Sequence, residues 1–147
     1  MTEKIKIPII NTSGNALPEY ATPGSSGLDI RAYVDSPLII KPLERVLVPT
    51  GLFVALPEQY EIQIRPRSGL ALKHGITCLN TPGTIDSDYR GEIKVLLINL
   101  SNENQTIQNN DRIAQLVIAK VEKAEFFSVT EINETNRGVG GFGHTGK

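Results

Sequence analysis

The densest group of reactive side chains lies in residues 84–92, between two strand-like segments. It holds three carboxylates, Asp86, Asp88 and Glu92, with an aromatic residue and an arginine beside them. A positioned carboxylate can act as a general base that takes a proton from an attacking water. The same composition also fits a hairpin turn with solvated charges, and the segment alone favours neither interpretation.

A second group, residues 64–69, places two arginines and a hydroxyl at a predicted helix start. Arg67 and Ser68, with backbone N–H groups such as that of Gly69, could form a cradle for phosphate oxygens. A surface turn with ordinary charges is the alternative interpretation.

Two further polar residues stand at predicted strands. Residues 24–30 form a turn that enters a strand, and Asp29 lies at its beginning. Residues 111–116 have the pattern of a strand in which Gln115 is a polar position. Each segment alone fits an ordinary structural role, so any functional signal comes from their combination and order.

The C-terminal stretch differs in composition from the rest of the chain, because five of the last ten residues are glycines. Such a stretch cannot stay packed by itself, since each glycine loses much backbone entropy on ordering. A plain linker rarely carries an arginine and an aromatic, yet Arg137, Phe142, His144 and Thr145 stand in or beside this stretch. We therefore predict an arm that becomes ordered over a ligand or a neighbouring subunit.

This arm matches two nucleotide-binding motifs that we reject. Residues 138–143 fit G-x-G-x-x-G, but a dinucleotide fold needs that run between a strand and a helix, with an acidic residue about 20 positions on. Residues 141–147 fit most of a Walker A loop, but the sequence ends at Lys147 without the Ser/Thr for Mg²⁺ or a following helix. We expect neither a dinucleotide fold nor a P-loop enzyme.

The elements that must position these groups are predicted to be strands. Residues 4–7 and 60–64 alternate with the period of two of half-buried strands. Residues 68–75 fit one short helix, with Ser68 capping its start and Gly75 ending it. Many short strands with turns between them are typical of a sandwich, jelly roll or barrel. Further candidate strands are 28–34, 38–40, 45–48, 52–56, 92–100, which should be buried on both faces, and 112–121.

Length and charge limit the remaining possibilities. The 147 residues make one domain, and 15 Lys and Arg against 16 Asp and Glu give no electrostatic footprint for nucleic acid or an anionic membrane. No apolar run approaches the about 18 residues of a membrane span, and Met1–Lys6 lacks the apolar region of a signal peptide. We expect a cytoplasmic protein whose single cysteine, Cys78, is a core thiol.

In combination and order, five segments resemble the motifs of the trimeric dUTPase family, and the resemblance runs from near Asn15 to the C-terminus. It implies an all-β, jelly-roll-like barrel or sandwich with one short helix in residues 1–125, and a glycine-rich arm in residues 126–147 that is exchanged in a homotrimer. It also implies Mg²⁺-dependent hydrolysis of dUTP to dUMP and pyrophosphate, which keeps uracil out of DNA and supplies dUMP for thymidylate synthesis. The five segments are 27–32, 66–71, 83–92, 112–116 and 137–143.

The resemblance also implies roles for individual residues. Asp86 is the general base that directs a water in line onto the α-phosphorus, and Asp29 contacts or supports the hydrated Mg²⁺. Each site takes the first, second and fourth motifs from one subunit, the third from another and the arm from the remaining one. The residues implied in binding the base and sugar are Asn80, Gly83, Tyr89 and Phe142. The residues implied in binding phosphates are Arg67, Ser68, Gly69, Gln115, Arg137 and Thr145.

These implied contacts account for selectivity. Asn80 and the backbone near Gly83 pair with the uracil edge, and cytosine would leave these protein groups unpaired. The tight hairpin excludes the thymine methyl group. Tyr89 packs under the sugar and leaves no space for a 2′-hydroxyl. Phe142 stacks on the base as the arm closes.

The chain departs from the family pattern at two positions. Asn110 replaces the usual glycine before an Asp-Arg pair, and asparagine tolerates a positive φ better than most residues. His144 replaces a serine in the arm, which leaves Thr145 as the hydroxyl for a phosphate contact. A histidine there also suggests the hypothesis of a pH-sensitive lid.

Two other functions remain open from the sequence. A dCTP deaminase shares the fold, but its chains are typically longer and its third segment differs from residues 86–90. A binding or regulatory protein on the same fold is the alternative from another class.

Overall fold

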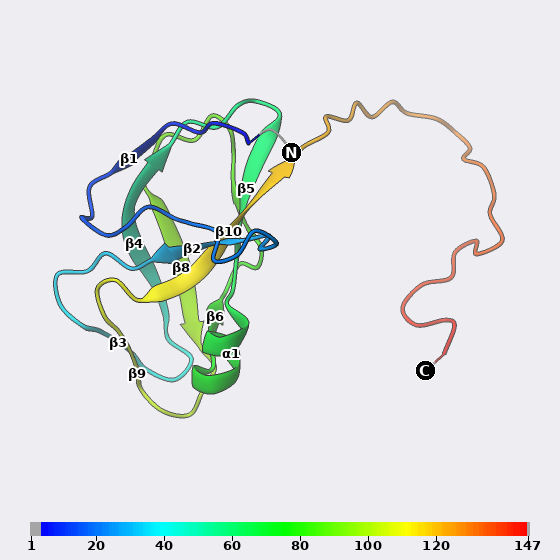
Figure 1. Ribbon diagram of the computed structural model, residues 1–147. Coiled ribbons are helices and arrows are strands. Elements are labelled where there is room, and N and C mark those ends of the chain that lie inside the picture. The colour runs from blue at the N-terminus through cyan, green and yellow to red at the C-terminus, as the bar shows by residue number, and fades with distance from the viewer. Residues whose placement is uncertain (1–3, 147) are drawn as a thin grey trace.

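The structure is a computed structural model that describes residues 4–146, and it consists mainly of short strands (Figure 1). One four-stranded sheet has the order β1-β4-β8-β6, a second has the order β2-β10-β5-β7, and β3 pairs with β9. All these pairings are antiparallel. The strands are β1 (Ile9–Asn11), β2 (Leu28–Arg31), β3 (Leu38–Ile40), β4 (Arg45–Val54), β5 (Tyr60–Arg65), β6 (Ile76–Cys78), β7 (Gly83–Ile85), β8 (Ile93–Asn99), β9 (Gln105–Ile107) and β10 (Arg112–Lys120), and the helix is α1 (Ser68–His74).

The predicted all-β, jelly-roll-like class with one short helix is confirmed, in the form of a sandwich whose two main sheets stay separate. Both sheets contribute to one apolar cluster that includes Ile30 of β2, Ile64 of β5 and Val95 of β8. Such a cluster forms because one face of each antiparallel sheet packs inward.

The strand β8 is buried on one face, which corrects the prediction that residues 92–100 are buried on both. Val95 and Leu97 are buried, Lys94 is exposed, and Leu96 is half-buried. The reason is the two-layer architecture, since a strand with a sheet on one side only alternates between core and surface.

The strand β4 runs unbroken past Pro49, although the sequence predicts two strands there. Its register with β8 shifts between Pro49 and Leu52, so a β-bulge accommodates the proline without ending the strand. Gly51 lies in this bulge with a φ of 68°, a conformation that glycine adopts without steric cost. The alternating residues 4–7 are not in a strand, because β1 begins only at Ile9.

The helix α1 has Arg67, not Ser68, as its N-cap, and no side chain caps it. Arg67 keeps an extended backbone with φ −96° and ψ 127°, so Ser68 already lies in the first turn. Gly75 ends the helix in the left-handed conformation as predicted. Asn110 also adopts a positive φ, 72°, a conformation that asparagine tolerates better than most residues.

The single thiol lies in the core, as the sequence predicts. Cys78 in β6 is 2% exposed, and burial raises the pKa of its thiol to about 11. The thiol is therefore protonated at neutral pH and is a packing group.

The chain after β10 forms a long arm that runs away from the two sheets (Figure 1). Residues 121–146 contain no helix or strand, and the side chains of residues 122–139 are all exposed. The predicted division between residues 125 and 126 remains a prediction. Residues 1–3 and 147, at the outer ends of the two predicted parts, lie outside the described residues. No helix within residues 4–146 is long and apolar enough to cross a membrane.

Candidate functional site

The sheet β2-β10-β5-β7 brings three of the sequence segments to one place. Gln115 of β10 lies opposite Asp29 of β2 on one side and Arg65 of β5 on the other. Arg67 follows β5 by two residues, so its side chain reaches back over the end of β2. Residues that are far apart in the sequence therefore meet because their strands are neighbours in the sheet.

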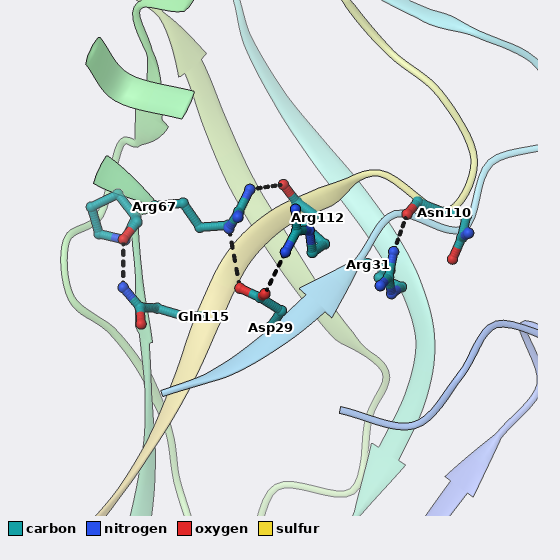
Figure 2. Close-up of polar contacts among 7 residues, drawn as sticks. Asp29, Arg31, Arg67, Asn110, Arg112 and Gln115 are labelled. Carbon is teal, nitrogen blue, oxygen red and sulfur yellow. Dashed lines mark hydrogen bonds and ion pairs between the residues drawn. The ribbon is translucent and has the colours of Figure 1, made fainter. Parts of the chain in front are cut away.

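Asp29 is the centre of this group, since each of its carboxylate oxygens meets a different arginine (Figure 2). Arg67 Nε lies 3.1 Å from Asp29 Oδ1, and Arg112 Nη1 lies 3.2 Å from Asp29 Oδ2. Arg67 Nη1 also donates to the carbonyl of Arg112 at 3.2 Å. One carboxylate between two guanidinium groups leaves a net positive charge, which suits the binding of an anion.

The amide of Gln115 is held in a defined orientation. Its Nε2 donates to the carbonyl of Pro66 at 3.0 Å (Figure 2). Any side chain at Gly27 would overlap Gln115 Oε1, so the absence of one lets the amide lie against that backbone. A primary amide has two N–H donors, and the second is free to bind a ligand.

Ser68 and Gly69 lie next to this cluster, in the exposed first turn of α1. The first N–H groups of a helix have no partner within it. A Cβ at Gly69 would meet no other described atom within 4 Å, so the backbone there is open to approach by a ligand. Arg67 and Arg112 also line a cavity of about 350 Å³ beside the turn.

The predicted base-binding residues lie at the beginning of β7. Gly83 pairs with Ile64 of β5 and is buried. A Cβ at Gly83 would lie 3.3 Å from Asn80 Nδ2 and 3.2 Å from the Cβ of Ile64. Asn80 and Gly83 are thus close neighbours in the segment that connects β6 of one sheet to β7 of the other, and Asn80 is exposed.

Asp86 follows β7 and lies apart from the arginine cluster. It is exposed and lines a hollow with Tyr60, Glu61 and Lys123. Its neighbour Ile85 pairs with Ile62, and Ile62 lies three residues, or about 10 Å, along β5 from the partner of Gln115. Within one chain, Asp86 therefore does not reach the arginine cluster.

Tyr89 lies in the turn after Asp86, and its N–H donates to the carbonyl of Asp86 at 3.2 Å. Its hydroxyl donates to the carbonyl of Glu92 at 2.8 Å, so the ring folds back over the turn. The side chain is 43% exposed, which leaves part of the ring accessible to a ligand.

Within residues 4–146, the contacts of the predicted arm residues lie inside the arm itself. Arg137 Nε donates to the carbonyl of Gly140 at 2.8 Å, and Phe142 is fully exposed with a φ of 51°. His144 packs its ring against Gly140 and, with Arg137 and Thr145, lines a hollow in the arm. The arm that carries these residues runs away from the two sheets (Figure 1).

Two residues of the cluster had no role assigned from the sequence, Arg112 and Gly27. β10 is irregular between Arg112 and Ala114, so strand periodicity does not tell to which side Arg112 points. Gly27 matters because it has no side chain, which leaves space for the amide of Gln115. This contact can be recognised only when the pairing of β2 with β10 is known.

Comparisons with known sequences agree on one family. The dUTPase family model matches residues 14–146. A deoxyuridine 5′-triphosphate nucleotidohydrolase from Fusobacterium nucleatum is 59% identical over 145 residues, which cover 99% of both chains. A protein of the same name from Cytophaga hutchinsonii is 61% identical over 147 residues, which cover 100% of this chain and 94% of that protein.

Solved structures show the same fold. A variant of the Staphylococcus bacteriophage 80alpha dUTPase with dUpNHpp has a TM-score of 0.85 at 22% identity, covering 98% of this chain and 100% of that chain. A variant of the phage phi11 dUTPase of S. aureus, described with a structural Mg(II) ion, has a TM-score of 0.77 at 22% identity, covering 88% and 100%. At these identities the likeness concerns the fold alone.

Proposed function

The chain belongs to the dUTPase family, and we propose that it hydrolyses dUTP to dUMP and pyrophosphate at a site shared between subunits. The observation that carries this proposal is the group of Asp29, Arg67, Arg112 and Gln115, a preorganised cationic edge that suits a polyphosphate. The relatives named deoxyuridine 5′-triphosphate nucleotidohydrolase support dUTP as the substrate.

Asp86 is the proposed general base. Its carboxylate accepts a proton from a water whose oxygen bonds to the α-phosphorus, while the bond from that phosphorus to the pyrophosphate oxygen breaks in line. The exposure of Asp86 at the end of β7 supports this role, because a water and a substrate can both reach it. The electron pair of the broken bond leaves with pyrophosphate.

The phosphate oxygens are bound by groups that the fold already orients. Arg67 uses two of its donor groups on Asp29 and on the Arg112 carbonyl, which fixes its plane and leaves the other N–H groups for phosphate. Gln115 offers its second amide N–H, and Ser68 and Gly69 offer a hydroxyl and a backbone N–H. Arg137 and Thr145 add their donors from the arm.

Mg²⁺ is the proposed cofactor, and it would neutralise charge on the phosphate oxygens as the α-phosphorus reacts. The donor chemistry fits a metal that is held mainly by the nucleotide and water. Both oxygens of Asp29 are engaged by arginines at 3.1 Å and 3.2 Å, so Asp29 suits contact through water or support of the site. A structure of the same fold, that of the phage phi11 dUTPase variant, is described with a structural Mg(II) ion, which agrees with the choice of this metal.

A homotrimer with shared sites is the proposed assembly. Its support is that, within one chain, Asp86 lies apart from the arginine cluster and the arm runs away from the sheets (Figure 1). Three chains related by a closed rotation can bring these parts together, each chain giving one part to each site. Residues 126–147 would then act as a lid that a neighbouring subunit supplies.

In this proposal, the residues around the beginning of β7 select the base and the sugar. Asn80 and the backbone of Gly83 bind the uracil edge, and their close approach leaves little space for a thymine methyl group. Tyr89 packs under the deoxyribose, and Phe142 stacks on the base when the arm closes. The reaction would keep uracil out of DNA and supply dUMP for thymidylate synthesis, in the cytoplasm.

Release of pyrophosphate tests the proposal. The protein is incubated with dUTP, dTTP, dCTP and UTP, with and without Mg²⁺, and pyrophosphate and ammonia are measured. We expect pyrophosphate from dUTP alone, and only with Mg²⁺. Ammonia from dCTP would support a deaminase, and dUTP binding without any release would support a binding protein.

A further inference from the structure

We propose that Glu92 is a positioning residue for Tyr89, and that it thereby sets the discrimination between deoxyribose and ribose. The inference rests on the proposed function, because it takes Tyr89 as the residue that packs under the sugar. Glu92 itself does not touch the nucleotide in this proposal. It acts through the place that it gives to the Tyr89 ring.

The Tyr89 ring is fixed on one side by its own turn. Its hydroxyl donates to the Glu92 carbonyl at 2.8 Å, three residues later in the chain. A Cβ at Gly91 would lie 2.6 Å from Cζ and 2.9 Å from Cε2 of Tyr89, so the ring occupies the space that a side chain at residue 91 would need. The position of the ring therefore depends on where the backbone of Gly91 and Glu92 lies.

The Glu92 side chain ties that backbone to the body of the protein. Its Oε1 accepts a hydrogen bond from the N–H of Gly51 at 2.9 Å, and its side chain is only 22% exposed. Its Oε2 lies 3.9 Å from Lys94 Nζ, a longer contact with a side chain that is 44% exposed. The bond to Gly51 is the stronger of the two, because it is shorter and better shielded from water.

Gly51 is a rigid anchor for this bond. It lies in the bulge of β4 with a φ of 68°, and its carbonyl accepts bonds from Thr12 N at 2.8 Å and Thr12 Oγ1 at 3.1 Å. A Cβ there would lie 2.9 Å from Ser13 N, so the neighbouring chain packs closely on it. The hydrogen bond to the Gly51 N–H therefore restrains the Glu92 carboxylate, and with it the Glu92 carbonyl that accepts from Tyr89.

Loss of the Glu92 carboxylate should free both the Gly51 N–H and the backbone at residues 91–92. The buried Gly51 N–H loses its partner, and the backbone at residues 91–92 can move away from β4. The Tyr89 ring then no longer has a fixed acceptor and opens space for a 2′-hydroxyl. Binding of a ribonucleotide should improve relative to a deoxyribonucleotide, while the phosphate groups of the site are unchanged.

The experiment measures binding of the α,β-imido analogues of dUTP and UTP by calorimetry, so that turnover is not required. The wild type is compared with Glu92→Ala, Glu92→Asp and Glu92→Gln. The first two cannot reach Gly51 and should lower the ratio of the two affinities about tenfold. Glu92→Gln keeps an oxygen that accepts from Gly51 and should retain the wild-type ratio.

A matched control exists in another turn. Glu44 Oε2 accepts a hydrogen bond from Lys41 N at 2.7 Å, so Glu44→Ala removes the same kind of contact far from the Tyr89 turn. This variant should leave the ratio unchanged. Tyr89→Phe removes the hydroxyl that meets the Glu92 carbonyl and should lower the ratio as Glu92→Ala does.

An unchanged ratio in folded Glu92→Asp and Tyr89→Phe would overturn the inference, and Glu92→Asp serves if Glu92→Ala does not fold. The proposed function is judged separately, by pyrophosphate release from dUTP by the wild type. A wild type without release but with a ratio that depends on Glu92 would refute the hydrolysis and support the positioning role.

Discussion

The sandwich of residues 4–120 and the arm of residues 121–146 follow different physical rules. In the sandwich, alternate apolar residues face inward and close a common core in which Ile30, Val95 and Leu97 are fully buried. In the arm, apolar side chains point into solvent, and Phe126 is 97% exposed. Burial of apolar surface can offset the entropy lost on ordering in the first case but not in the second.

This difference indicates where each part obtains its order. The sandwich positions Asp29, Arg67 and Gln115 without help, because its own strands hold them. The arm carries Arg137 and Phe142 but has no surface of its own to pack against. In the proposed assembly a nucleotide or a neighbouring subunit orders the arm, so the following changes should affect the two parts differently.

The largest effect is expected in the sandwich, from Asp86→Asn. The amide cannot accept the proton of the attacking water, so kcat should fall by at least about 1,000-fold. Binding of dUpNHpp and the melting temperature should stay the same, because Asp86 is exposed and outside the core. Asp88→Asn in the same turn is the control, and retained turnover in Asp86→Asn would remove Asp86 from the role of base.

Deletion of residues 136–147 should have the next largest effect. It removes Arg137, Phe142 and Thr145 together, and kcat/KM for dUTP should fall roughly 100-fold. The melting temperature and the trimer should be retained, since no side chain in residues 136–139 or 142–146 is buried. Full activity of the truncated chain would contradict the role of the arm as a lid.

Phe142→Ala should have a smaller effect within the arm. Loss of stacking on the base should raise the KM for dUTP about tenfold, with no change in the free energy of unfolding, because the ring is fully exposed without ligand. Val139→Ala, an equally exposed apolar residue of the arm, is the matched control. Equal KM values for the two variants would show that the ring does not contact the base.

The smallest effect concerns the core and the pH dependence of stability. The pKa of Cys78 rises from 9.0 to about 11 on folding, so the folded state binds the proton more tightly. Its contribution is present below pH 9 and is lost as the pH rises toward 11. Between pH 8 and pH 10, the wild type should lose roughly 1 kcal/mol more of unfolding free energy than Cys78→Ala.

Chemical denaturation at the two pH values measures the free energy of unfolding of each protein. The change between the two pH values is taken within each protein, so the packing lost in Cys78→Ala does not enter the comparison. An equal loss in both proteins would mean that the thiol ionises as freely in the folded state as in the unfolded one.

Much of the sandwich could be predicted from local sequence. Residues 38–40, 60–64 and 112–121 match β3, β5 and β10 to within one residue, because alternation and turn residues mark strand ends. The errors at Pro49 and Ser68 have local causes that sequence patterns do not record. A bulge carries β4 past the proline, and the extended backbone of Arg67 moves the helix start by one residue.

The site was less accessible to sequence reasoning, because its contacts depend on the sheet order. The pairing of β2 with β10 and of β10 with β5 places Arg112 on Asp29 and Gly27 on Gln115, and no spacing in the chain encodes that. The roles of Asp86 and the arm depend further on an assembly, so they remain predictions from family resemblance.

Mixing two inactive variants tests the shared site most directly. Asp86→Asn supplies an intact arm, and the chain truncated before residue 136 supplies an intact Asp86. The two are unfolded together, refolded in equal amounts and assayed for pyrophosphate release from dUTP. If the general base and the arm of each site come from different subunits, random trimers should recover about one quarter of the wild-type activity. Activity that stays at the level of the separately refolded variants would mean that both come from one chain, and the proposed division of each site among three subunits would be wrong.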